Sequence, residues 1–255
     1  MGSIRVGVVG ATGRMGRTAC DAVVAAEGLE LVALVDVHGS DMIRELRVTS
    51  DLQSLVDAAC DVVVDFTTAE AARETLPFLA LHGIHAVVGT TGFDDRDLLA
   101  FETAFDGSSA NCLIAANFAI SAVLMMRFAA EAAALFDTAE IIELHHDQKI
   151  DAPSGTALAT ARMMTPSDNG WADDPTQVED PTGSRGGIGP NGVRIHSVRM
   201  RGMTAHQEVI LGAQGQTLTI RQDSYDRTSF MPGVVLACRR ISGAAGLTMG
   251  LDALL

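Results

Sequence analysis

A single lysine occurs in this 255-residue chain, and it lies among side chains that could move protons. Lys149 follows His145, His146 and Asp147, whereas every other cationic side chain is an arginine. Guanidinium stays charged in proteins, while an ammonium is a compact proton donor whose pKa can be tuned. An arginine-rich composition with one lysine at an arbitrary position is the alternative. We favour proton chemistry at Lys149, with a histidine as its partner.

The residues after Lys149 predict an anion site at the start of a helix. Ser154 has the residue type of an N-cap, and helix-forming residues follow it. The N–H groups of Gly155 and Thr156, with the Thr156 hydroxyl, could then bind a carboxylate. His145 and His146 end a predicted strand, so their side chains point to opposite sides and differ in role. Either histidine could instead only cap or pack.

Other chemistries find no support around this segment. The histidines and Asp147 could suggest a metal, but HExxH and Cys/His ligand spacings are absent, and we expect no metal. A GxSxG motif is also missing, and the lone lysine does not follow a glycine as a P-loop requires.

A second candidate site is a glycine loop near the N-terminus. The segment Gly10-Ala11-Thr12-Gly13-Arg14-Met15-Gly16 lies between a predicted strand and a predicted helix, in the GxxGxxG variant of a dinucleotide-binding fingerprint. Asp36 ends the next strand, 20 residues after Gly16, where an acid can accept hydrogen bonds from ribose hydroxyls. That acid favours NAD, but Arg14 could receive a 2′-phosphate, so use of both NADH and NADPH is open.

Two further segments fall at the ends of predicted strands. Gly89-Thr90-Thr91-Gly92 and Asp65-Phe66-Thr67 belong at the carboxyl edge of a sheet, where doubly wound folds bind ligands. Simple turn formation is the other interpretation. We expect Gly89, Thr90 and Thr91 to contact the cofactor.

The pattern of apolar residues predicts a Rossmann-type first domain. Val- and Ile-rich runs alternate with helix-like segments, which indicates a parallel sheet covered on both faces. The predicted strands are 4–9, 29–35, 61–66, 85–88 and 112–115, and the predicted helices are 14–26, 69–82 and 94–105.

The rhythm changes after Asn117. A long helix over 119–136 is followed by strands at 139–145, 193–200, 206–211 and 217–222, with a short helix from Ser154 and a long loop over 165–191. These features predict a second α+β domain with a mixed or antiparallel sheet. A helix over 230–241 could return to the first domain. We therefore expect residues 1–117 with 228–255 to form a dinucleotide-binding domain, and 118–227 to bind substrate and mediate oligomerisation.

Composition limits the partners. The formal net charge of −14 argues against nonspecific binding to nucleic acid or to an anionic membrane. Apolar stretches are too short to span a bilayer, and the N-terminus enters a strand pattern without a signal-like segment. The four cysteines form no CxxC pair and fit a reducing compartment, so we expect a cytoplasmic protein.

The motifs together resemble the 4-hydroxy-tetrahydrodipicolinate reductase (dihydrodipicolinate reductase) family, which acts in diaminopimelate and lysine synthesis. Glu143-Leu144-His145-His146 through Lys149, followed by Asp151-Ala152-Pro153-Ser154-Gly155-Thr156-Ala157, is similar to the family signature. The glycine loop, Asp65-Phe66-Thr67, Gly89-Thr90-Thr91-Gly92, Asn117-Phe118 and Arg227-Thr228-Ser229-Phe230 also match. Ala116 stands where the family usually has Pro, and Ser121 where it has Gly.

The resemblance implies a role for each matched residue. NAD(P)H would be held by Gly10, Ala11, Thr12, Gly13, Arg14, Met15, Asp36, Gly89, Thr90, Thr91, Ala115, Ala116, Asn117 and Phe118. His145 would be the proton donor and acceptor, and Lys149 a second proton donor. His146, Gly155 and Thr156 would bind a dicarboxylate substrate, and the second domain would assemble a homotetramer through its sheet.

The expected reaction is hydride transfer to a conjugated cyclic imine, with loss of the 4-hydroxyl group as water. Two rivals share parts of these features: an amino-acid dehydrogenase of the aspartate or homoserine type, and a protein that binds NAD(P)H without catalysis. The first does not require the His-His-Lys and Ser-Gly-Thr-Ala segments, and the second would bind nucleotide without oxidising it.

Overall fold

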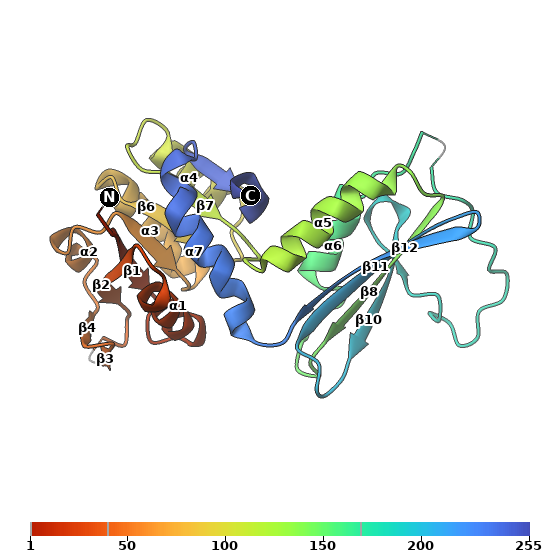
Figure 1. Cartoon of the computed structure of the whole chain (residues 1–255), viewed down its shortest axis with the longest axis horizontal. Coiled ribbons are helices and arrows are strands. Elements are labelled where there is room, and N and C mark those ends of the chain that lie inside the picture. Colours follow the sequence, from red (N-terminus) through yellow and green to blue (C-terminus); the bar gives the residue numbers. More distant parts are fainter. Residues whose placement is uncertain (1, 40, 169) are drawn as a thin grey trace. The chain divides into compact units, whose positions relative to one another are not determined.

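The structure is a computed structural model that describes residues 2–39, 41–168 and 170–255. The chain divides into two compact units (Figure 1). Unit 1 comprises residues 1–120 and 227–255, and unit 2 comprises residues 121–226. Each unit has its own sheet and its own buried core.

Unit 1 is a doubly wound α/β domain. Its strands run in the order β13-β7-β6-β5-β1-β2-β4-β3, and all pairs are parallel except β3 with β4. The winding reverses between β1 and β5, and the carboxyl ends of strands beside such a switch point are where these folds bind dinucleotides. The strands are β1 (Ile4–Val9), β2 (Leu29–Val35), β3 (Met42–Ile43), β4 (Leu46–Thr49), β5 (Val62–Asp65), β6 (His85–Val88), β7 (Cys112–Ile114) and β13 (Leu247–Met249).

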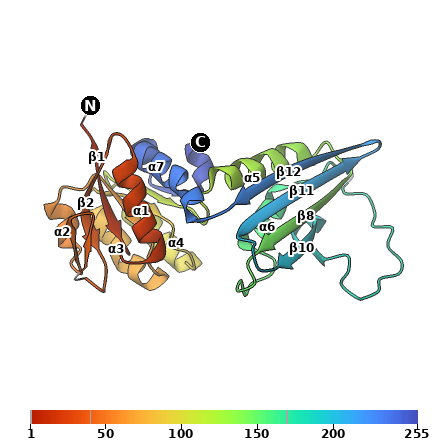
Figure 2. The ribbon, with the colours of Figure 1, turned by 60° about the horizontal axis from the view of Figure 1, so that its bottom comes forward.

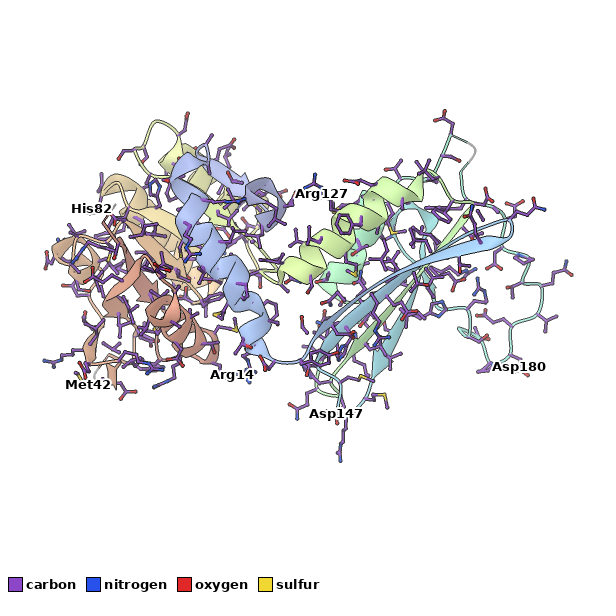
Figure 3. All side chains as sticks on the ribbon, viewed as in Figure 1. Arg14, Met42, His82, Arg127, Asp147 and Asp180 are labelled. Carbon is purple, nitrogen blue, oxygen red and sulfur yellow. The ribbon has the colours of Figure 1, made fainter. Side chains whose placement is uncertain are left out.

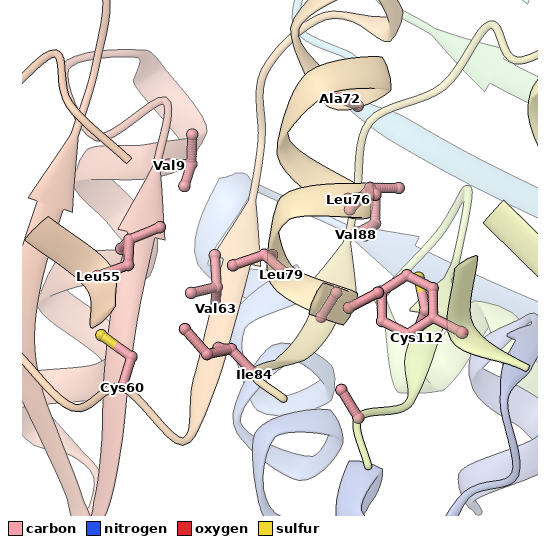
Figure 4. Close-up of a cluster of buried hydrophobic side chains, with 14 of the residues drawn as sticks. Val9, Leu55, Cys60, Val63, Ala72, Leu76, Leu79, Ile84, Val88 and Cys112 are labelled. Carbon is pink, nitrogen blue, oxygen red and sulfur yellow. The ribbon is translucent and has the colours of Figure 1, made fainter. Parts of the chain in front are cut away.

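Helices cover both faces of this sheet, which explains why its central strands are apolar along most of their length. The helices are α1 (Arg14–Ala25), α2 (Gln53–Asp57), α3 (Ala69–Leu81), α4 (Asp95–Phe105) and α7 (Met231–Arg240). Side chains of α2, α3 and α4 share one core cluster with the strands, including Leu55, Val63 and Leu79 (Figure 4). Helices α1 and α7 pack together and α7 contacts β1, β5 and β6, so they cover the opposite face.

Four short elements of unit 1 were not predicted from the sequence. The short β3 and β4 pair and helix α2 lie between β2 and β5, and β13 extends the far edge of the sheet beside β7. Each is shorter than six residues, so it has too few residues to show a period. Their packing partners in the sheet decide their structure.

Unit 2 has a mixed sheet with helices on one face (Figures 1 and 2). The strand order is β12-β11-β8-β10-β9, with β8 parallel to β10 and antiparallel to β11. The strands are β8 (Thr138–His145), β9 (Gly187–Ile188), β10 (Arg194–Arg199), β11 (Ala205–Ala213) and β12 (Gln216–Ser224). Helices α5 (Ile120–Ala133) and α6 (Gly155–Met163) form one core cluster with Ile141, Val209 and Leu211.

The alternation of β8 determines which of its side chains reach the helices. Ile141 and Glu143 are fully buried, whereas Glu140 and Ile142 are half-buried on the other face. His145 lies on the helix-side face with Glu143, because residues two apart on a strand share a face. The sequence therefore aims one acid and one histidine in the same direction.

In the described part of the long connection between α6 and β10, the regular elements are the short β9 and one 3-10 turn at Pro190–Gly192. The lack of a sustained period over residues 165–191 thus corresponds to a mostly irregular segment. All four cysteines belong to the described residues, are buried and carry free thiols, and burial raises the pKa of the Cys20 thiol to about 12. Within the described ranges, no helix is long and apolar enough to cross a membrane.

Candidate functional site

The glycine loop of unit 1 has the close backbone approaches that its sequence predicts. Gly10 has a φ of +79°, and a Cβ on it would lie 2.7 Å from the carbonyl oxygen of Phe66. A Cβ on Gly16 would lie 2.0 Å from the carbonyl oxygen of Gly10. Side chains at both positions are therefore excluded by the fold itself. Helix α1 begins after Gly13, which supplies no side-chain cap, so its first turn presents N–H groups suited to an anion.

Asp36, at the end of β2, is held in place by two backbone donors. The N–H of Thr12 donates to Oδ2 at 3.0 Å, and the N–H of His38 donates to Oδ1 at 3.0 Å. Burial opposes ionisation of Asp36, but these hydrogen bonds outweigh it, and the pKa of its carboxyl lies below the usual range. The residue is thus a carboxylate fixed against the glycine loop.

A pocket opens beside Asp36 and the glycine loop. It has a volume of about 390 Å³ and is lined by residues from the ends of β1 and β2, the segment after β5 and the start of α3. Gly10, Asp36, His38 and Phe66 are among its lining residues. A concave site of this size, mostly apolar with one fixed carboxylate, suits an adenosine group. The donor set therefore fits the dinucleotide that the sequence predicts.

The segments after β5 and β6 are joined by a buried acid. Oδ1 of Asp65 accepts from the Thr67 N–H at 2.9 Å, the Thr67 hydroxyl at 2.7 Å and the Thr90 hydroxyl at 2.8 Å. Asp65 is fully buried, and this burial raises its pKa despite the hydrogen bonds. Asp65 consequently connects the Phe66–Thr67 segment to the Gly89–Thr91 segment.

The remaining expected cofactor residues also lie at this edge of unit 1. Ala115 continues from β7, and its N–H donates to the carbonyl oxygen of Val88 at 2.9 Å. Oδ1 of Asn117 accepts from the Ala119 N–H at 2.8 Å, and the ring of Phe118 meets Phe66 edge-on at 6.0 Å. Ala116 lies between them in the same segment. The fold thus gathers every predicted cofactor residue at the carboxyl ends of β1, β2, β6 and β7.

In unit 2, His145 is paired with an acid to which the sequence reasoning assigned no role. Nδ1 of His145 lies 2.6 Å from Oε2 of Glu143, whose side chain is completely buried. Glu143 also meets Arg199 of β10: Nη1 donates to Oε2 at 2.7 Å and Nη2 to Oε1 at 2.8 Å. Burial disfavours the Glu143 carboxylate, but hydrogen bonds from His145, Arg199 and Ser197 prevail and lower its pKa to about 2.

The same acid also holds the start of α6. The Ser154 N–H donates to Oε1 of Glu143 at 3.1 Å, and the Ser154 hydroxyl caps α6 by accepting from the Ala157 N–H at 3.2 Å. Arg199 donates to the carbonyl oxygen of Asp151 at 2.7 Å. The predicted anion site is therefore fixed by side chains from β8 and β10. At Gly155, no described atom outside its chain neighbours and its own helix backbone lies within 4 Å of where a Cβ would stand, so this side of the helix start is open.

Lys149 lies in the turn after β8 and contacts an acid. Its Nζ is 2.8 Å from both carboxylate oxygens of Asp151, and about one-fifth of its side chain is exposed. The Lys149 N–H donates to the carbonyl oxygen of His146 at 3.2 Å. His146 is exposed, unlike His145, and Asp147 extends from the tip of the same loop (Figure 3). The two histidines thus differ in their surroundings, because His145 is the last residue of β8 whereas His146 lies beyond the strand.

The structure brings His145, Lys149 and the start of α6 onto one end of the unit 2 sheet. The sequence predicted no role for Glu143, Arg199 or Asp151, although Glu143 and Asp151 lie in the segments that resemble the family signature. Glu143 had a usable signal, because an acid two residues before a candidate histidine on a strand shares its face. Arg199 had none, since it reaches Glu143 only through the register that places Arg199 opposite His145. No group of three or more His, Cys, Asp or Glu side chains within the described ranges could hold a metal ion.

The fold and the sites together define a class of protein. A doubly wound domain carries the glycine loop and the Asp36 carboxylate, and an α+β unit carries ionisable groups. This combination is typical of two-domain oxidoreductases with a Rossmann-type NAD(P)-binding domain. Comparisons with known proteins specify the family. A family model described as dihydrodipicolinate reductase, N-terminus, matches residues 4–118, and one described as dihydrodipicolinate reductase, C-terminus, matches residues 121–255.

Full-length relatives agree with these matches. The 4-hydroxy-tetrahydrodipicolinate reductase of Corynebacterium aurimucosum is 50% identical over 253 residues, covering 98% of each chain. That of Nocardia farcinica is 50% identical over 255 residues, again covering 98% of each. A dipicolinate-bound dihydrodipicolinate reductase from Paenisporosarcina sp. TG-14 superimposes with a TM-score of 0.89 at 38% identity, covering 99% of this chain and 100% of that one. The chain belongs to the dihydrodipicolinate reductase family.

Proposed function

We propose that this protein reduces 4-hydroxy-tetrahydrodipicolinate to tetrahydrodipicolinate, with loss of water, using NADH or NADPH. Relatives at 50% identity carry the name of this activity over nearly the whole chain. The observation in the structure that supports it most directly is the His145–Glu143 pair, which shares one end of the unit 2 sheet with Lys149, paired to Asp151, and with the capped start of α6. These groups supply a proton donor, a cation and an anion site, which a dicarboxylate imine needs.

Unit 1 holds the cofactor in this proposal. The backbone of Gly10 to Met15 receives the pyrophosphate at the start of α1, and Asp36 accepts hydrogen bonds from the adenosine ribose. Gly89 to Thr91 and Ala115 to Phe118 contact the remainder of the dinucleotide. The nicotinamide, when bound, supplies the hydride. All of these segments lie at the carboxyl edge of the unit 1 sheet, which supports the assignment.

Unit 2 binds and protonates the substrate. Gly155, Thr156 and His146 bind one carboxylate, while Lys149 stabilises negative charge that develops on the ring and supplies a second proton. His145 donates the proton that the reduced, enamine-like ring requires, because imidazole can both give and take a proton near neutral pH. The start of α6 fixes one carboxylate and the Lys149 cation fixes the other, which lowers the entropic part of the barrier.

We further propose that NADH is bound more tightly than NADPH. Asp36 is ionised and immobilised by Thr12 and His38, so it repels a 2′-phosphate and accepts from a 2′-hydroxyl. Arg14, at the start of α1, offers a positive charge that keeps NADPH usable. Activity with both cofactors, with the lower KM for NADH, is the expected pattern.

The proposed assembly is a homotetramer formed through the face of the unit 2 sheet opposite α5 and α6. Ile142 and Leu144 of β8 and Ile210 of β11 are half-buried apolar residues that alternate away from the helix-side core. Light scattering coupled to gel filtration measures the mass directly. We place the enzyme in the cytoplasm, where reduced nicotinamides and free thiols such as those of its four cysteines are maintained.

A coupled assay tests the activity. Dihydrodipicolinate synthase generates the unstable substrate in the cuvette, and loss of reduced nicotinamide is followed by absorbance. The proposal expects rapid oxidation that depends on the synthase, with aspartate, homoserine and other amino acids inactive in the reverse direction. Nucleotide binding without synthase-dependent oxidation would identify a protein that only binds NAD(P)H, and turnover of an amino acid would identify an amino-acid dehydrogenase.

A further inference from the structure

We propose that Glu143 is a positioning residue for the reaction: it holds the His145 ring so that Nδ1 carries a proton and Nε2 is the atom that exchanges a proton with the substrate. This inference rests on the proposed role of His145 and adds a residue to it. Glu143 does not itself contact the reacting atoms, since it is completely buried.

The contact between the two side chains determines the tautomer. A carboxylate can only accept hydrogen bonds, so at 2.6 Å from Oε2 the Nδ1 atom of His145 must be the donor. Nε2 is the other ring nitrogen, and among the described residues it has no hydrogen-bond partner. When an imidazolium gives its Nε2 proton to the substrate, the neutral ring that remains carries its proton on Nδ1. Glu143 stabilises both of these forms.

The surroundings of Glu143 keep it ionised and prevent rotation. Arg199 binds both carboxylate oxygens in a fork, and the Ser154 N–H occupies Oε1, which leaves Oε2 to His145. Hydrogen bonds from His145 and Arg199 outweigh the burial penalty and keep the pKa of Glu143 far below neutral. Glu143 is thus a fixed acceptor that links the proton donor to the start of α6, where the substrate carboxylate is expected.

Replacing Glu143 by glutamine separates this role from a merely structural one. The amide has one oxygen and one NH₂ group, and the NH₂ cannot face the Ser154 N–H, because two donors would meet. Arg199 contacts both positions and so favours neither. The NH₂ group therefore occupies the place of Oε2, and His145 must accept on Nδ1. Its proton then lies on Nε2, and the imidazolium loses its partner.

We expect Glu143→Gln to lower kcat by about 100- to 10 000-fold. Losses of this size are found in other enzymes when general acid catalysis is removed or when the catalytic histidine is held in the wrong tautomer. KM for both substrates should stay within about threefold, because the amide oxygen still accepts from Ser154 and keeps the anion site in place. Glu143→Asp keeps the charge and should recover part of the lost turnover. A kcat within about threefold of wild type in Glu143→Gln would overturn the proposal.

Glu140 provides a matched control on the same strand. It also pairs with one histidine and one arginine: its Oε2 lies 2.8 Å from Nε2 of His196, and its Oε1 accepts from Arg185 at 2.6 Å. It alternates to the face of the sheet opposite Glu143. Glu140→Gln removes the same charge from the same kind of network and should keep kcat within about threefold. Gel filtration of Glu143→Gln and Glu140→Gln measures any change in oligomeric state independently of kcat.

A spectroscopic measurement on the wild-type protein tests the tautomer directly. It does not depend on whether the Glu143→Gln variant folds, or on enzymatic activity. Protein with ¹⁵N-labelled histidine is compared with His145→Gln to assign the His145 signals, under alkaline conditions in which imidazole is neutral. We expect the attached proton on Nδ1. A proton on Nε2 would overturn the positioning role even if reductase activity is normal. Conversely, absence of synthase-dependent turnover with a proton on Nδ1 would refute the proposed function and leave the geometry of Glu143 intact.

Discussion

Arg199 neutralises the most deeply buried charge of unit 2, so its removal should destabilise the protein. In Arg199→Met, Glu143 keeps His145 and Ser154 but loses the guanidinium that binds both of its oxygens. The apolar stem of methionine replaces much of the arginine stem, so the variant chiefly removes the charge and the hydrogen bonds. Glu143 has no exposed surface through which water could replace them.

Two routes give the magnitude. Breaking a buried ion pair by removing one partner costs about 3–5 kcal/mol in other proteins. Separately, the pKa of Glu143 falls from its ordinary 4.5 to about 2, and each pKa unit corresponds to about 1.4 kcal/mol, which totals about 3 kcal/mol shared among its donors. We therefore expect Arg199→Met to lose about 2–4 kcal/mol, or about 6–12 °C in Tm for a chain of this length.

The pH dependence has a defined sign. Because the pKa of Glu143 is lowered on folding, its contribution is complete above pH 4.5 and is lost as the pH falls toward 2. Wild type should therefore lose stability over this window, and Arg199→Met should lose less. Urea titrations followed by circular dichroism at several pH values measure both effects.

Arg201→Met is the matched control. Arg201 pairs with Asp147 at 3.0 Å, but its side chain is 94% exposed, and such pairs contribute little. Its Tm should stay within about 2 °C of wild type. If Arg199→Met also stays within that margin at neutral pH, the reasoning about Glu143 is wrong.

Three further predictions concern the sites themselves. Lys149→Arg should keep the fold and the affinity for NADH. In the coupled assay it should lower kcat at least about 100-fold, because a guanidinium does not release a proton. Near-normal turnover would contradict the proton role of Lys149. Asp36→Ala should raise the KM for NADH about 10- to 100-fold and shift preference toward NADPH, since a charged hydrogen bond to the ribose is lost; an unchanged cofactor ratio would exclude the ribose contact. Gly16→Ala should abolish NADH binding measured by fluorescence, because the added Cβ would lie 2.0 Å from the Gly10 carbonyl oxygen and force the loop to move. Normal binding would show that the glycine loop tolerates this movement.

The long periodic elements could be predicted because local pattern determines them. The strands at Ile4–Val9, Leu29–Val35 and His85–Val88 have the predicted bounds, since continuous apolar runs fit a sheet covered on both faces. Strand β13 could not be predicted, because three residues have no period and only the edge of β7 makes them a strand. The mixed character of the unit 2 sheet also depended on one pairing, the parallel contact of β8 with β10.

The candidate site divides in the same way. Residue types alone marked Lys149, the paired histidines, Ser154 and the glycine loop, because each has chemistry or backbone freedom that few other residues share. The partners that control these groups are ordinary acids and arginines, which occur throughout the chain. Glu143 and Arg199 are 56 residues apart, and nothing in their spacing joins them.

The amino-acid sequence alone therefore determined which groups can do chemistry and which of the longer segments become helices and strands, since both depend on residue type and short-range pattern. Only the tertiary structure decided what surrounds those groups: that Glu143 is buried against His145, that Arg199 neutralises it, and that Asp36 is held by Thr12 and His38. The physical reason is that burial, charge pairing and hydrogen bonding depend on distance in space, which sheet register and helix packing establish between residues far apart in the chain.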